Sequence, residues 1–99
     1  MVKGNNNAEA LIPTEKNISV YPNPFNPTTT FRVSLPQAGF ARLAVYNMLG
    51  QKVATVVDGE MPAGYNDVRF DGSTLSSGMY LYRLEMEKYV RSGKILLMK

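Results

Sequence analysis

The acidic residues between positions 66 and 73 are the first candidates for chemistry in this sequence. Asp67 and Asp71, with Asn66 and Ser73 nearby, carry the oxygen atoms that a hard cation such as calcium prefers as ligands. Their spacing matches no EF-hand loop, because the D-x-[DN]-x-[DN]-G run and the closing Glu of that motif are absent. We therefore predict no metal site, and we assign these residues to a solvent-exposed strand face and to turn caps.

A pair of glutamates and a group of serines are the other residues that could belong to a catalytic site. Glu85 and Glu87 alternate on one face of an expected strand and could suggest the carboxylate pair of a glycosidase, but such a pair needs a cleft and no second acidic strand is apparent. Ser73, Ser76 and Ser77 have no histidine to activate them, because the chain contains neither His nor Cys. The same absence removes imidazole and thiolate metal ligands. We expect no catalytic residue, no cofactor and no enzyme activity.

The tyrosines are a third possible source of function, because exposed aromatic rings on a β-sheet can stack on sugar rings. There are six of them: Tyr21, Tyr46, Tyr65, Tyr80, Tyr82 and Tyr89. The other interpretation is that the rings pack in the core and the hydroxyl groups bind the backbone, as in the tyrosine corner of sandwich domains. We favour the core and corner roles, and we keep a carbohydrate-binding surface as the alternative.

The charge of the chain is weakly positive and spread out. Its 99 residues include 11 Lys and Arg against 8 Asp and Glu, a net charge of +3 with a pI near 9.3. The arginines stand singly among apolar neighbours, so we expect no nucleic-acid binding. No stretch approaches the ~18 consecutive apolar residues of a transmembrane segment. The N-terminus also lacks the apolar region of a signal peptide, so we expect no export signal of its own there.

Most of the chain consists of short segments with a hydrophobic period of two, which is typical of half-buried strands. We expect strands near residues 17–21, 28–35, 40–49, 51–57, 66–71, 79–87 and 89–99. The connections between them are too short for helical crossovers, so the strands must pair antiparallel. The pattern predicts an all-β protein, an antiparallel β-sandwich of about seven strands in two sheets.

The inward faces and the turns of this sandwich can be assigned to residues. Gly50 and Gly78 suit turns, Asp58-Gly59 is a turn dipeptide, and Gly93 marks an expected bulge in the last strand. The side chains expected in the core include Phe31, Val33, Leu43, Val45, Val68, Phe70, Tyr80 and Tyr82.

The first part of the chain differs in composition from the rest. Residues 1–16 are polar and Asn-rich, so we expect a flexible linker or tail there and a folded domain at residues 17–99. Three prolines lie within residues 22–27, where they should exclude both helix and ladder pairing and force the chain to turn.

Several stretches together resemble a known family in their order and spacing. They are Tyr21-Pro22-Asn23-Pro24-Phe25-Asn26-Pro27 before a strand that ends at Leu35-Pro36, then Val45-Tyr46-Asn47-Met48-Leu49-Gly50-Gln51-Lys52-Val53, then Leu75-Ser76-Ser77-Gly78-Met79-Tyr80-Leu81-Tyr82-Arg83-Leu84, and finally Lys94-Ile95-Leu96-Leu97-Met98-Lys99. Over about residues 18–99 the chain resembles the C-terminal sorting domain of type IX (Por) secretion substrates, type A. It also resembles the related flagellar-hook-capping Ig-like modules. Phe70 stands where many members of the family have Trp.

This resemblance implies an Ig-like sandwich at the C-terminus of a secreted bacterial protein, fused to a cargo domain upstream. The type IX secretion machinery would take the cargo from the periplasm across the outer membrane. A sortase-like protease would then remove the domain and attach the cargo to the cell surface. The alternative function is an accessory Ig-like or fibronectin-like spacer, or a carbohydrate-binding module, of an extracellular enzyme.

The last strand is the part that we expect the secretion machinery to bind. An edge strand offers unpaired backbone groups to a partner, and Arg91, Lys94 and Lys99 would favour an acidic receptor surface. We expect Lys99, as the last residue, to be unencumbered. For Ile95 and Leu97 two roles are possible, recognition by the partner and completion of the core, and the two are compatible.

Two further expectations concern the ends of the domain. Pro22, Asn23 and Pro24 either contact the receptor or form a rigid corner of the sandwich, and we favour the corner. A terminal strand that closes a sandwich can also exchange between copies, which would give a strand-swapped homodimer.

Overall fold

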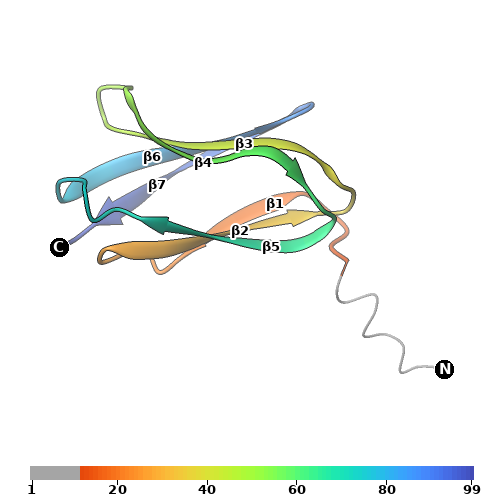
Figure 1. The fold of residues 1–99 in the computed structure, drawn as a ribbon, viewed down its shortest axis with the longest axis horizontal. Coiled ribbons are helices and arrows are strands. Elements are labelled where there is room, and N and C mark those ends of the chain that lie inside the picture. The colour runs from red at the N-terminus through yellow and green to blue at the C-terminus, as the bar shows by residue number, and fades with distance from the viewer. Residues whose placement is uncertain (1–11) are drawn as a thin grey trace.

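The computed structural model describes residues 12–99, which form seven β-strands and no helix (Figure 1). The strands are β1 (Asn17–Tyr21), β2 (Thr28–Leu35), β3 (Gly39–Tyr46), β4 (Lys52–Met61), β5 (Gly64–Asp71), β6 (Gly78–Met86) and β7 (Tyr89–Leu97). They pair with one another antiparallel throughout. The predicted fold class, an Ig-like antiparallel β-sandwich, is therefore confirmed.

The strands form two sheets, which Figure 1 shows as two layers facing each other. The first sheet has the strand order β1-β2-β5, and the second has the order β4-β3-β6-β7. The chain passes from one sheet to the other after β2, β4 and β5. As a result β7 is an edge strand, with β6 on one side only.

The core lies between the sheets because every second side chain of a strand points inward. Phe31, Val33 and Leu35 of β2 and Leu43 and Val45 of β3 have no solvent exposure. Phe70 and Tyr80 are also buried, and Val68 and Tyr82 are partly buried against the same core.

Aromatic contacts connect the two sheets. Between the sheets, the Phe31 ring of β2 lies 5.3 Å from the Tyr82 ring of β6 in an edge-to-face arrangement. Within the first sheet, the Phe31 ring lies 6.2 Å from the Phe70 ring of β5. Such ring pairs contribute about 0.5–1.5 kcal/mol each beyond the area that they bury. The Tyr80 hydroxyl donates a hydrogen bond to the Ser76 carbonyl oxygen at 2.6 Å, a backbone contact of the tyrosine-corner kind.

Asn47 fixes the turn between β3 and β4. Its Oδ1 accepts hydrogen bonds from the N–H groups of Leu49 and Gln51, both at 3.0 Å, and its Nδ2 donates to Gln51 Oε1 at 2.8 Å. Gly50 has a φ of +86°, a conformation that residues with a side chain rarely adopt. Gly78, which begins β6, has a φ of +152°.

The Asp58-Gly59 dipeptide is not a turn, contrary to the sequence prediction. Strand β4 continues through it to Met61. Asp58 stands opposite Arg42 of β3, and its carboxylate lies 3.6 Å from the Arg42 guanidinium group. Pairing with β3 thus outweighs the local preference of this dipeptide for a turn. The chain turns at residues 62–63 instead, before Gly64 with its φ of +117°.

The predicted bulge at Gly93 is also absent. Strands β6 and β7 pair without interruption, and Gly93 stands opposite Tyr82. The Tyr82 ring lies over Gly93, so that a Cβ atom at this position would be 2.5 Å from the tyrosine hydroxyl oxygen. Gly93 is therefore needed for the close approach of an aromatic ring and not for a kink in the strand.

Replacing Gly93 by alanine should lower the free energy of unfolding by about 1–3 kcal/mol, because the new methyl group displaces the Tyr82 ring from Phe31. Chemical denaturation measures this change. Gly59→Ala in β4 is the matched control, since a Cβ atom there meets nothing within 4 Å. A loss of equal size in both variants would contradict the explanation.

Candidate recognition surface

The proline-rich segment between β1 and β2 lies along the outer edge of β7, at the end of the sandwich where Figure 1 places the C-terminus. The Phe25 N–H donates to the Leu96 carbonyl oxygen, and the Phe25 carbonyl oxygen accepts from the Met98 N–H, both at 2.9 Å. These bonds form a parallel bridge between Phe25 and Leu97. The expectation that the prolines exclude all ladder pairing is therefore wrong at Phe25, because this residue keeps its own N–H.

Asn23 extends this contact with its side chain. Its Nδ2 donates to the Lys94 carbonyl oxygen and its Oδ1 accepts from the Leu96 N–H, each at 3.0 Å. The carboxamide thus takes the place of a peptide group from a neighbouring strand. We call these four hydrogen bonds, two from Asn23 and two from Phe25, the terminal clasp. It joins residues that are 71 to 73 positions apart in the chain.

The core supports the terminal clasp from below. The Phe25 side chain is 2% exposed, and its ring lies 6.1 Å from that of Phe70. Gly72 leaves the space for this ring, because a Cβ atom there would be 3.2 Å from Phe25 and 3.3 Å from Leu97. The Gly72 N–H also donates to the Pro27 carbonyl oxygen at 2.8 Å. The segment is consequently a well-anchored corner of the sandwich.

The proposed recognition residues divide into a buried and an exposed group. The side chains of Ile95 and Leu97 are 0% and 1% exposed and belong to the core. A partner that binds the folded domain therefore has access only to the side chains of the exposed group, which are Pro22, Asn23, Pro24, Arg91, Lys94 and Lys99.

Lys99 is held in place, contrary to the expectation that it is unencumbered. Its N–H donates to Ser77 Oγ at 3.0 Å, and its Nζ donates to the Ser73 carbonyl oxygen at 2.7 Å. Both acceptors belong to the connection between β5 and β6, which reaches the same end of the sandwich in Figure 1. The end of β7 is thus bonded to two different connections of the domain.

The candidate calcium ligands do not converge on one point. Asp67 accepts two hydrogen bonds from Arg32, at 2.8 Å and 3.2 Å, which lower the pKa of the Asp67 carboxyl and raise the pKa of the Arg32 guanidinium. Asp71 instead accepts from the Ser73 N–H at 2.9 Å and caps a turn. Asn66 donates to backbone carbonyls near the start of its own strand. In residues 12–99, no group of three or more His, Cys, Asp or Glu side chains could hold a metal ion.

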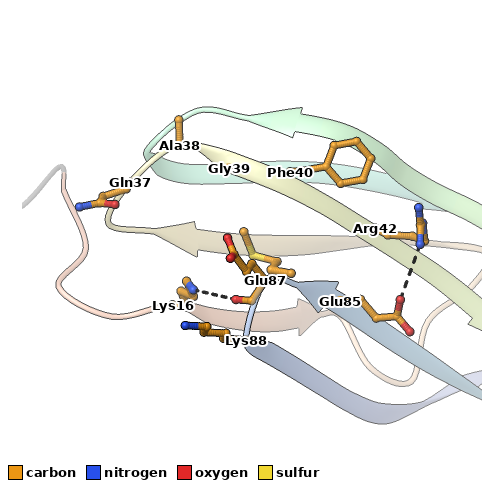
Figure 2. Close-up of a pocket in the computed structure, with 10 residues that line it drawn as sticks. Lys16, Gln37, Ala38, Gly39, Phe40, Arg42, Glu85, Glu87 and Lys88 are labelled. Carbon is orange, nitrogen blue, oxygen red and sulfur yellow. Dashed lines mark hydrogen bonds and ion pairs between the residues drawn. The ribbon is translucent and has the colours of Figure 1, made fainter.

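A groove of about 680 Å³ lies between the start of β3 and the β6–β7 turn (Figure 2). The carboxylate of Glu85, one of the lining residues, lies 2.7 Å from Arg83 Nε and 3.9 Å from Arg42 Nη1. Lys16 Nζ donates to the Glu87 carbonyl oxygen at 3.5 Å. Glu87 lies in the turn beyond β6, so the two glutamates do not share a strand face as the sequence suggested.

The two halves of the terminal clasp are the first and last of the sequence stretches that set this chain apart from a generic sandwich. A family model described as "Secretion system C-terminal sorting domain" matches residues 19–98, which include both halves.

The chain belongs to this family.

Sorting domains of this family direct the protein that carries them to type IX secretion, and the secretion machinery recognises them. This chain is accordingly a sorting domain that targets a secreted cargo protein for type IX secretion, to the cell surface or outside. The family is one of targeting domains and not of catalytic ones. No curated protein matches the chain. Over residues 12–99, no helix has the length and apolar character needed to cross a membrane.

The structural roles of two residues of the sorting domain were not predicted from the sequence. Phe25 anchors the proline-rich segment in the core, and Thr29, which is 2% exposed, donates from its Oγ1 to the Pro22 carbonyl oxygen at 2.6 Å. A signal for Phe25 was present, because a single large aromatic residue within a polar, proline-rich segment needs a place in a core. Nothing in the sequence indicated that the Asn23 side chain would bond the backbone of Lys94 and Leu96.

Replacing Asn23 by alanine should lower the free energy of unfolding of the sorting domain by about 1–2 kcal/mol, because two hydrogen bonds of about 0.5–1.5 kcal/mol each are lost. Hydrogen exchange at the Leu96 N–H should become faster, since this group loses its acceptor. Asn26→Ala is the control within the same segment, because the Asn26 side chain is outside the clasp. An unchanged exchange rate at Leu96 would refute the role of the clasp.

Proposed function

We propose that the secretion machinery recognises this sorting domain on the surface that carries the terminal clasp. One observation carries the proposal: Asn23 and Lys94, from motifs at opposite ends of the domain, are hydrogen-bonded to each other on the surface. Pro22 and Pro24 flank the first of these residues, and Arg91 lies near the second on the same strand. The exposed basic side chains of β7 favour an acidic receptor surface.

Recognition at this surface depends on folding. The clasp orders Asn23 only while Phe25 and Leu97 are packed in the core, since these buried side chains hold the two segments together. An unfolded sorting domain would offer the same residues without a fixed arrangement. A receptor that serves many cargo proteins gains from such a rigid surface, because little ordering is left to be done on binding.

The proposal extends to the parts that flank the domain. Residues 1–16 link the sorting domain, of type A, to a cargo domain upstream, and a sortase-like protease cuts this linker after export. The cargo then stays at the cell surface, while the sorting domain has no catalytic activity of its own. Of this linker, residues 1–11 lie outside the described residues. Lys16 is attached to the domain, because its carbonyl oxygen accepts from the Tyr89 hydroxyl at 3.3 Å, so we place the cut before it.

A fusion experiment tests this function. A fluorescent reporter with a separate export signal, placed ahead of the sorting domain, should reach the surface or medium of a bacterium that has type IX secretion. Removal of residues 89–99 should leave the reporter in the periplasm. Because that deletion also takes Ile95 and Leu97 out of the core, a second variant is needed.

The second variant is Arg91→Glu with Lys94→Glu, which changes only exposed side chains. It should reduce export about tenfold, which corresponds to about 1.4 kcal/mol of binding free energy. Its free energy of unfolding should fall by no more than about 1 kcal/mol, the contribution of the exposed cation–π contact between Arg91 and the Tyr89 ring. Arg69→Glu, which reverses one charge on the exposed face of β5, is the control for charge reversal away from this surface. Undiminished export of the second variant would count against recognition at this surface.

A further inference from the structure

The clasp occupies only part of the outer edge of β7. In an antiparallel pair, the backbone groups of alternate residues point toward and away from the partner strand. Leu96 points away from β6, because both its N–H and its carbonyl oxygen are bonded in the clasp. By alternation Val90, Ser92 and Lys94 point the same way. Of these three residues, the clasp engages only the Lys94 carbonyl oxygen.

The remaining backbone groups form what we call the open edge: the N–H and carbonyl groups of Val90 and Ser92 and the N–H of Lys94. Within residues 12–99, no backbone hydrogen bond outside the β6 pairing reaches them. The Val90 side chain is 55% exposed. A hollow of about 490 Å³ adjoins the open edge, and Tyr46, Leu81, Val90 and Ser92 are among the residues that line it. A short strand could therefore add here and place an apolar side chain in the hollow.

We propose that the open edge binds an extended, acidic peptide strand of the secretion machinery by β-augmentation. This inference rests on the proposed function and restricts it to one segment of β7. The clasp marks one end of the site, because Asn23 and Phe25 already occupy the edge from the Lys94 carbonyl group onward. The partner strand therefore pairs with residues 90–94 and not with the last residues of the chain.

Charge selects the partner. Arg91 and Lys94 are the charged residues of β7, and both are basic and exposed. They are three positions apart and so lie on opposite faces of the sheet. A second copy of β7 would bring like charges together along this edge, which disfavours self-pairing. A partner strand with two acidic residues three positions apart would instead place one carboxylate beside Arg91 on one face of the sheet and the other beside Lys94 on the opposite face.

A blocked heptapeptide, Thr-Glu-Val-Thr-Glu-Val-Thr, is the probe for this site. Paired antiparallel with its central threonine opposite Ser92, it places its glutamates opposite Lys94 and Arg91 and its second valine opposite Val90. One control peptide has lysine in place of both glutamates. The other is methylated on the nitrogen of the central threonine, which removes the donor to the Ser92 carbonyl oxygen and keeps both charges.

The titration follows the backbone N–H signals of the full chain by NMR at low ionic strength. We expect the acidic peptide to shift the signals of Val90, Ser92 and Lys94 and to leave that of Met98, which the clasp engages, unchanged. Each control peptide should bind at least about tenfold more weakly, a loss of about 1.4 kcal/mol. Equal binding of the methylated peptide, or shifts centred on β1, β4 or β5, would overturn the proposal.

Ser92→Pro tests the site from the side of the domain. The Ser92 N–H points away from β6, so proline removes no hydrogen bond of the sheet but blocks a partner strand. Peptide binding should be lost in this variant. Should it fail to fold, Arg91→Glu with Lys94→Glu decides the matter, because that variant should prefer the lysine peptide to the glutamate peptide. An unchanged preference would overturn the proposal.

The same experiments distinguish two other occupants of the open edge. If the peptide binds only after residues 1–11 are removed, the chain covers its own edge. If sedimentation shows a dimer that the peptide dissociates, a second copy of the chain occupies the edge, including the case of a strand-swapped dimer. Either result would overturn the proposal.

The reporter assay separates this inference from the proposed function. Equal export of the wild-type and Ser92→Pro fusions would refute the open edge as the binding site and leave the sorting function intact. Failure of the wild-type fusion to be exported would refute the proposed function itself, whatever the peptide titration shows.

Discussion

The hydrogen-bonding needs of an edge strand govern the arrangement of this domain. β7 has a partner on one side only, so the backbone groups on its other side must find acceptors and donors or face water. Residues 22–27 lie beside it but cannot form a full strand, because three of them are prolines without an N–H. The chain uses the backbone of Phe25 and the carboxamide of Asn23 instead. The edge is therefore closed along one half of β7 and open along the other.

This partial closure connects the surface to the core. Phe25 and Leu97 meet beneath the clasp, and Gly72 allows both to come close. The hydrogen bonds at the surface and the packing below them consequently form together, as one unit. Exposed basic side chains then stand on a support that fixes their positions, as the proposed recognition by shape and charge requires.

The sequence was sufficient to predict features that depend on local pattern, and insufficient where distant segments meet. The period of two predicted β1 and β2 with their observed bounds, because alternation of burial is a property of each strand alone. Asp58-Gly59 has the local sequence of a turn, but backbone pairing with β3 keeps it extended. Gly93 predicts a bulge locally, but the structure needs a glycine there because the Tyr82 ring packs against it. The hydrogen bond between Asn23 and Lys94 spans 71 positions, and no spacing rule within either motif reveals it.

That separation has a consequence for biosynthesis. The ribosome makes Asn23 and Phe25 before the residues of β7, so the first six strands emerge before the segment that completes their core. A product of premature termination before β7 lacks Ile95 and Leu97 and has no clasp. Under the proposed recognition at the clasp, a cargo protein whose sorting domain stops before β7 would therefore stay unexported.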